Sequence, residues 1–146
     1  MKRAAWVLSL ASGTLLLAGA VNAQEESPLP KGFTAVPVLK AGKTATGDPL
    51  VYLQTQKPEV VSVVATLEPK GQTAVHRHPV PVFVYILEGQ LIVRDEGKER
   101  REYKAGEAFL ETVGMWHQAF NEGDQHTKIL VVFFGEEGKP TTEAKQ

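Results

Sequence analysis

Short segments rich in β-branched residues, separated by glycine and proline turns, follow one another through most of the chain. Residues 60–67 contain four valines and one threonine. The other candidate strands are 36–39, 50–54, 82–87, 91–95, 100–104, 108–112, 117–121 and 127–134. Valine, isoleucine, threonine and aromatic residues favour strands, whereas glycine and proline end them. No longer segment shows a helical hydrophobic period. The pattern therefore predicts an all-β fold of about ten strands, a sandwich or barrel of the jelly-roll kind.

The first 23 residues have the order of a secretory signal. Lys2 and Arg3 precede an apolar run over 4–20, and residues 21–23 place small side chains at a cleavage site. We expect cleavage after Ala23 and export, to the periplasm in a Gram-negative cell or to the medium. An uncleaved membrane anchor is the alternative, but the run is short for a span and no cluster of charges follows it. We expect no membrane contact once the signal is removed.

The rest of the chain has the length and composition of one domain. Residues 24–35 contain prolines and polar side chains and are interpreted as a flexible arm, 36–135 as the barrel and 136–146 as a polar tail. Sixteen basic against seventeen acidic residues give a net charge of -1, which disfavours nucleic acid as a partner. The chain has no cysteine, which excludes disulfides, thiolate metal sites and cysteine nucleophiles.

His76 and His78 are the first residues along the chain whose spacing suggests a metal site. In a strand, residues two apart point to the same face, so both imidazoles can converge on one ion. Taken alone, the pair is more simply explained as two solvated histidines on a surface strand.

The residues around this pair resemble the two sequence motifs of the cupin family. The matching positions are Gly71, His76, His78, Gly89, Gly106, Gly114, His117 and Asn121. Two positions depart from the pattern: four rather than five residues separate Gly71 from His76, and Thr112 stands where the family has a proline. The resemblance implies a single-domain double-stranded β-helix, or jelly-roll, barrel around one divalent transition metal (Fe, Mn, Ni, Cu or Zn). His76, His78 and His117 match the three usual histidine ligands.

The usual glutamate ligand of the family is missing. Its place falls on Val82, which cannot ligate a metal. If Phe109 faces the interior, so does Glu111, two residues further along. A carboxylate aimed into a barrel needs a cation, a hydrogen-bond partner or a proton. Glu111 is thus a candidate fourth ligand, a support for a ligand or a general base. The alternative is a solvated carboxylate at the rim.

An apolar pocket is expected beside the metal. The residues expected to line it are Val82, Val84, Ile86, Phe109 and Trp116, which suit a small hydrophobic or aromatic ligand. For Trp116, plain packing is the alternative. The family resemblance also implies a homodimer, with Phe83, Tyr85 and residues 36–39 as candidate contacts.

Three functions remain open on the sequence. The first is a metal-dependent enzyme, resembling an oxygenase or an isomerase, in which Glu111 accepts a proton from a small-molecule substrate. The second is a non-catalytic periplasmic protein that binds a small molecule or a metal for sensing or storage. The third is a structural cupin with an empty site. Fold alone does not decide among them, because one fold hosts many chemistries.

Overall fold

The computed structural model describes residues 31–145. The expected signal sequence, its cleavage site and most of the expected arm lie outside this range. Residues 31–35 belong to one compact unit and the chain from Val36 onward to a second, which is the one described below. Within the described part of the chain, no helix has the length and apolar character of a membrane span.

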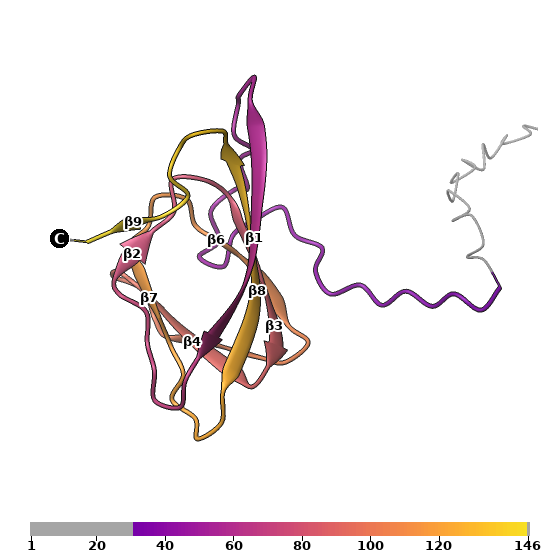
Figure 1. The fold of residues 1–146 in the computed structure, drawn as a ribbon, viewed down its shortest axis with the longest axis vertical. Coiled ribbons are helices and arrows are strands. Elements are labelled where there is room, and N and C mark those ends of the chain that lie inside the picture. Colours follow the sequence, from indigo (N-terminus) through magenta and orange to yellow (C-terminus); the bar gives the residue numbers. More distant parts are fainter. Residues whose placement is uncertain (1–30, 146) are drawn as a thin grey trace, which may run out of the picture. The chain divides into compact units, whose positions relative to one another are not determined.

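The second unit is built from β-strands, which confirms the all-β prediction. The strands are β1 Pro58–Leu67, β2 His76–Arg77, β3 Val82–Glu88, β4 Gln90–Asp95, β5 Arg101–Lys104, β6 Ala108–Glu111, β7 His117–Phe120, β8 Thr127–Glu136 and β9 Glu143–Ala144. They form two antiparallel sheets, with the orders β1-β8-β3-β6 and β5-β4-β7-β2-β9 (Figure 1). Neighbours within each sheet are mostly distant in the chain, as a jelly roll requires.

The core lies between the two sheets and follows the two-residue period of the strands. Val82, Val84 and Ile86 of β3 are at most 1% exposed, and they pack with Leu91 and Val93 of β4 from the other sheet. Alternate residues of a strand face opposite sides, so one face of each strand supplies the core. Burying each such side chain stabilises the fold by about 1.5–3 kcal/mol. The inner faces of β3 and β4 are therefore mostly apolar.

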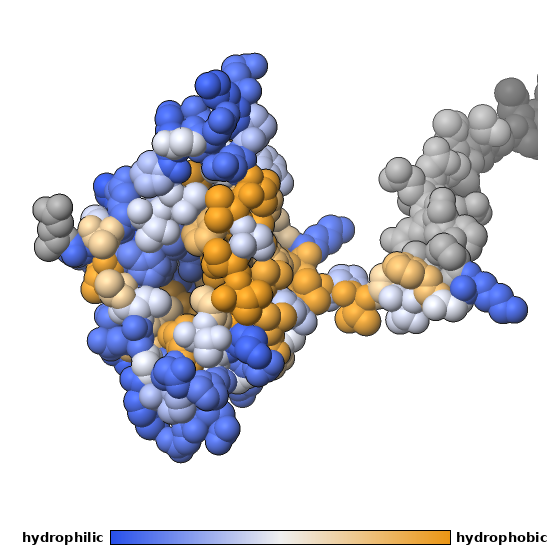
Figure 2. All heavy atoms as spheres, in the orientation of Figure 1, coloured by the Kyte–Doolittle hydropathy of each residue, from blue (hydrophilic) through white to orange (hydrophobic). Residues whose placement is uncertain are grey.

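The outer face of the first sheet is also apolar. Val60 and Val64 of β1 are 61% and 60% exposed, and Phe134 of β8 is 41% exposed. Figure 2 shows hydrophobic side chains gathered over the region of β1 and β8. Exposed apolar patches of this kind commonly mark contact surfaces.

Two expected strands do not form. Residues 36–39 and 50–54 have no regular structure, and only Lys43 and Pro49 form an isolated bridge between them. Pro37 has no backbone N–H to offer a neighbouring strand, and a strand persists only where a partner pairs with it. Within the polar tail the sequence predicts no strand, but Glu143–Ala144 pairs with β2 as strand β9.

Two residues of the motif pattern, one from each motif, have structural roles. A Cβ on Gly89 would lie 2.6 Å from the carbonyl oxygen of His126, and φ at this position is +76°. Asn121 is 2% exposed. Its amide group donates to the carbonyls of Leu67, Glu68 and Gln125, and its side-chain oxygen accepts from the backbone N–H of Gly123. Asn121 thereby joins the end of β1 to the turn before β8.

Replacing Asn121 by alanine should lower the free energy of unfolding by about 1–3 kcal/mol, because buried backbone groups lose their partners. Asn121→Asp should destabilise at least as much at neutral pH, since a carboxylate would face three carbonyl oxygens. Urea denaturation measures both changes. Gln125→Ala is the matched control, because its side chain is exposed and its backbone carbonyl remains. An Asn121→Ala protein as stable as the parent would contradict this role.

Candidate metal centre

Three histidines meet at one end of the barrel interior. His76 of β2 lies directly opposite His117 of β7, and His78 follows two residues after His76. The ring centroids are 4.3 Å apart for His76 and His117, 4.9 Å for His76 and His78, and 5.2 Å for His78 and His117. One nitrogen from each ring lies within 4.8 Å of the others, so the three histidines form a group that can hold a metal ion. His78 and His117 are buried, whereas His76 is half-buried.

Backbone carbonyls orient all three rings. Nδ1 of His76 is 2.8 Å from the carbonyl oxygen of Ala74, and Nδ1 of His117 is 3.0 Å from that of Met115. Nδ1 of His78 is 2.8 Å from the carbonyl oxygen of Thr141. A carbonyl only accepts, so each Nδ1 carries the hydrogen and each Nε2 keeps its lone pair in the neutral ring. Hydrogen bonds of this kind fix the tautomer and orientation of metal-binding histidines.

The carboxylate of Glu111 faces the same space. Its Oε2 lies 3.1 Å from Nε2 of His78, and its Oε1 lies 3.5 Å from Nε2 of His117. The side chain of Glu111 is 13% exposed, so it is turned inward and is not solvated at the rim. Its strand, β6, pairs with β3, and Glu111 lies directly opposite Val82. The position that the usual family glutamate would occupy thus faces Glu111 across one strand pair.

Charges in this group influence one another. Burial disfavours ionisation of Glu111, but its close contact with His78 and the neighbouring charges of His117, His78 and His76 hold its pKa below the ordinary value. Burial likewise disfavours protonation of His78, but Glu111 outweighs it, so the pKa of His78 is raised. The pKa of His76 is lowered, mainly by burial and further by the two other histidines. The buried carboxylate therefore needs a positive charge beside it, a proton or another cation.

Two buried acceptors show that a metal fits this place. Oε2 of Glu111 and Nε2 of His117 are inaccessible to solvent and have no well-aligned hydrogen-bond partner among residues 31–145. Buried polar atoms without partners are costly and uncommon. Imidazole nitrogens and a carboxylate oxygen are ligands that Zn, Fe, Mn, Ni and Cu accept. One divalent transition metal between these groups would satisfy both orphaned atoms.

The family model described as the cupin domain matches residues 63–133, which include all three histidines and Glu111. The chain contains a cupin domain. The fold and family expected from the sequence are thereby confirmed. No curated protein sequence matches the chain.

Solved structures resemble the fold of this cupin domain. The polyketide cyclase RemF from Streptomyces resistomycificus has a TM-score of 0.52 at 25% identity, over 60% of this chain and 61% of the cyclase. The DMSP lyase DddQ from Ruegeria pomeroyi has a TM-score of 0.52 at 21% identity, over 59% of this chain and 43% of the lyase. A protein with a double-stranded β-helix domain from Klebsiella pneumoniae has a TM-score of 0.51 at 20% identity, over 66% of this chain and 91% of its own. The chain covers less than two thirds of the cyclase and of the lyase.

An ion pair that the sequence interpretation did not single out lies on the inner face of the cupin domain, one strand from the histidines. Asp95 of β4 lies directly opposite His117, and its carboxylate pairs with Arg101 of β5. Arg101 also donates to the hydroxyl of Tyr103, whose ring stacks on Phe109 at 3.9 Å. The sequence did contain an indication of the inward position of Asp95. Residues 91, 93 and 95 alternate along one strand, which places Asp95 on the same face as two core residues.

The residues expected to line a substrate pocket lie in two different places. Four of them are at most 4% exposed and pack in the core: Val82, Val84, Ile86 and Phe109. That they also line a substrate cavity stays a prediction.

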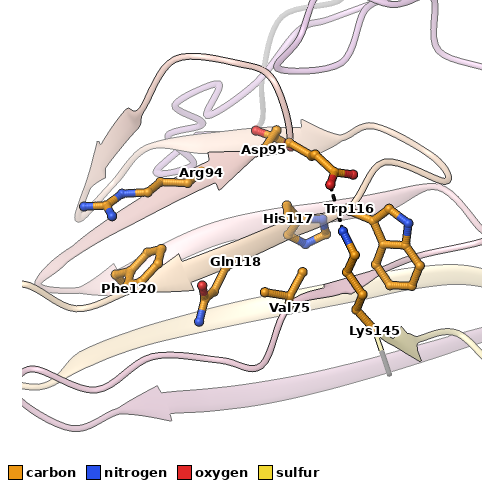
Figure 3. Close-up of a pocket in the computed structure, with 9 residues that line it drawn as sticks. Val75, Arg94, Asp95, Trp116, His117, Gln118, Phe120 and Lys145 are labelled. Carbon is orange, nitrogen blue, oxygen red and sulfur yellow. Dashed lines mark hydrogen bonds and ion pairs between the residues drawn. The ribbon is translucent and has the colours of Figure 1, made fainter.

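Trp116 differs from the expectation that it walls the barrel mouth. It precedes His117 and therefore points to the opposite face of β7, where it lines a groove of about 330 Å³ (Figure 3). The other side chains of this outer groove include Arg94, Gln118, Phe120 and Lys145.

Proposed function

We propose that this protein binds one divalent transition metal through Nε2 of His76, His78 and His117 and a carboxylate oxygen of Glu111. The observation that carries the proposal is the orientation of the rings. Each Nδ1 is bonded to a backbone carbonyl, so the three Nε2 atoms are the ones left for a metal. The orphaned Oε2 of Glu111 and Nε2 of His117 support a cation between them.

Glu111 replaces the usual family glutamate from the neighbouring strand. Residues directly opposite each other in an antiparallel pair have Cβ atoms about 4.5–5.5 Å apart. The glutamate side chain at 111 can therefore reach the space that a glutamate at 82 would reach, because the two positions are paired. The ligand set keeps one negative charge, and a divalent metal would leave the centre with one net positive charge.

We propose further that the centre acts as an enzyme on a small molecule, in the class of oxygenases or isomerases. When bound, the metal supplies Lewis acidity, which polarises a ligand oxygen and lowers the pKa of bound water. The half-buried His76 marks the side on which the centre meets solvent. Glu111, with two carboxylate oxygens and few competing partners, is placed to accept a proton. The apolar core behind the histidines excludes water from the other side.

The alternative is a protein that holds metal or a small molecule without turnover. One observation favours it. Val82, Val84, Ile86 and Phe109 fill the barrel behind the metal centre, which leaves a substrate only the solvent side. Storage or sensing of a metal needs no substrate cavity.

Moving the carboxylate between the paired strands tests the ligand set. Glu111→Val should weaken Zn²⁺ binding by roughly 10-fold or more, because the metal loses its charged ligand. Val82→Glu in the same protein should restore most of the affinity from the opposite strand. Competition with a chromophoric chelator measures the affinity, and elemental analysis gives the metal found after expression. Equal affinity of the parent and Glu111→Val proteins would remove Glu111 from the ligand set.

Turnover distinguishes the enzyme from the binding protein. The protein should be loaded in turn with Fe²⁺, Mn²⁺, Ni²⁺, Cu²⁺ and Zn²⁺ and incubated with pooled small organic acids and phenols. An enzyme should consume O₂ or deplete one compound only when loaded, and His76→Ala/His78→Ala should abolish both metal content and turnover. Tight metal binding without any consumption across the pools would favour storage or sensing.

We also propose that residues 1–23 direct export and are removed after Ala23. The support is the order of basic, apolar and small residues in the sequence. Amino-terminal sequencing of protein recovered from outside the cytoplasm should begin at Gln24. Recovery of the uncleaved chain in the membrane fraction would favour the anchor.

A homodimer is a further proposal, supported by the exposed apolar face of β1 and β8. Phe83 and Tyr85 point to this same outer face, opposite Val132 and Leu130. Val36 and Val38 are exposed as well, although residues 36–39 form no strand. Sedimentation should give a dimer for the parent and a monomer for Val60→Lys/Val64→Lys. A monomeric parent at high concentration would refute the proposal.

A further inference from the structure

The chain after β8 returns to the metal centre. It turns beyond Glu136 and then runs beside β2, where Glu143 lies opposite Arg77 and Ala144 opposite His76 (Figure 1). The backbone N–H of Lys145 donates to the carbonyl of Val75 at 2.9 Å, which extends the pairing by one residue. This segment, residues 139–145, therefore lies at the edge of the sheet, next to the strand that contains His76 and directly precedes His78.

The same segment holds His78 in place. Nδ1 of His78 donates to the carbonyl oxygen of Thr141 at 2.8 Å, and the hydroxyl of Thr142 lies 3.1 Å from the same nitrogen. The other two rings are anchored locally, because His76 bonds Ala74 and His117 bonds Met115, each two residues away. Of the three histidines, only His78 has an anchor from a distant part of the chain. Its orientation therefore depends on a contact that can be made and broken without unfolding β2.

The contacts that hold the segment are few and lie at the surface. Glu143 pairs with Arg77 at 2.7 Å. Lys145 pairs with Glu96 at 2.7 Å, across the outer groove and beside Trp116 (Figure 3). Exposed ion pairs contribute only about 0–1 kcal/mol each. A two-residue strand adds little more, so this segment belongs to the parts of a protein that open locally at low cost.

We propose that residues 139–145 are a C-terminal latch that positions His78 for the metal, so that latch docking and metal binding strengthen each other. The inference rests on the proposed metal centre and goes beyond it, since it assigns control of metal affinity to a segment that supplies no ligand. Undocking removes the Thr141 carbonyl from Nδ1 of His78, and the ring is then free to rotate or to change tautomer. Loss of such a supporting hydrogen bond commonly costs 10–100-fold in metal affinity. Coupling is reciprocal, so the metal must favour the docked latch by the same factor.

The first test compares the purified protein with a version that ends at Gly138. Zn²⁺ affinity, measured by chelator competition, should fall by about 10–100-fold on truncation, with an unchanged far-ultraviolet circular dichroism spectrum. Glu143→Ala/Lys145→Ala should weaken Zn²⁺ binding in the same direction but less. Glu88→Ala/Lys70→Ala is the matched control, because it removes two exposed ion pairs elsewhere and leaves net charge equally unchanged. Its Zn²⁺ affinity should equal that of the parent.

Hydrogen exchange on the full-length protein tests the reverse coupling and does not depend on the truncated chain folding. Zn²⁺ should slow exchange of the Lys145 amide by the same factor as truncation weakens binding. The Gly71 amide, bonded to Glu68 in a turn away from β2, should not change.

Two failures are distinguishable. A parent that binds no Zn²⁺ would overturn the proposed metal centre. A parent that binds Zn²⁺, but with unchanged Lys145 exchange and with unchanged affinity in the Glu143→Ala/Lys145→Ala protein, would overturn the latch alone. If truncation unfolds the protein, these two measurements decide.

Discussion

A buried carboxylate faces two imidazole nitrogens in the interior of this cupin domain, those of His78 and His117. The positive charge that this carboxylate requires is the constraint on which the rest of the site depends. Oε2 of Glu111 lies 3.1 Å from Nε2 of His78 and is inaccessible to solvent. The rings cannot turn their lone pairs away, because backbone carbonyls hold each Nδ1. A cation between the carboxylate and the Nε2 atoms would supply the positive charge that the carboxylate needs. A divalent metal would contact more of these atoms at once than a proton would.

Strand pairing explains how the site can keep a carboxylate that its motif lacks. Val82 and Glu111 are direct partners of β3 and β6, so side chains from either strand reach the same space. The proposed ligand set therefore needs a carboxylate at either one of the two paired positions. The same reasoning applies to Asp95, which β-pairing places opposite His117 although the two are far apart in the chain.

Prediction from the sequence worked where burial repeats every second residue. Residues 127–134 and 82–87 were expected as strands and form them, because their apolar side chains fill one core face. Residues 36–39 and 50–54 were expected as well, but composition did not show that they lack a pairing partner. In the tail, by contrast, the sequence predicted no strand where one forms. Residues 143–144 have no strand-like pattern, yet they pair with β2 through backbone groups that any residue supplies.

The sequence by itself determined the order of the main strands, through their composition, and the shared parity of Phe109 and Glu111, through the two-residue period of a strand. The set of three histidines followed from the resemblance to the cupin motifs. Only the tertiary structure decided that Glu111 lies opposite Val82, that Arg101 pairs with Asp95 and that the Thr141 carbonyl anchors His78. Those contacts depend on the register between distant segments. Every residue has a backbone carbonyl, whatever its side chain. A sequence motif therefore cannot indicate which carbonyl will anchor His78.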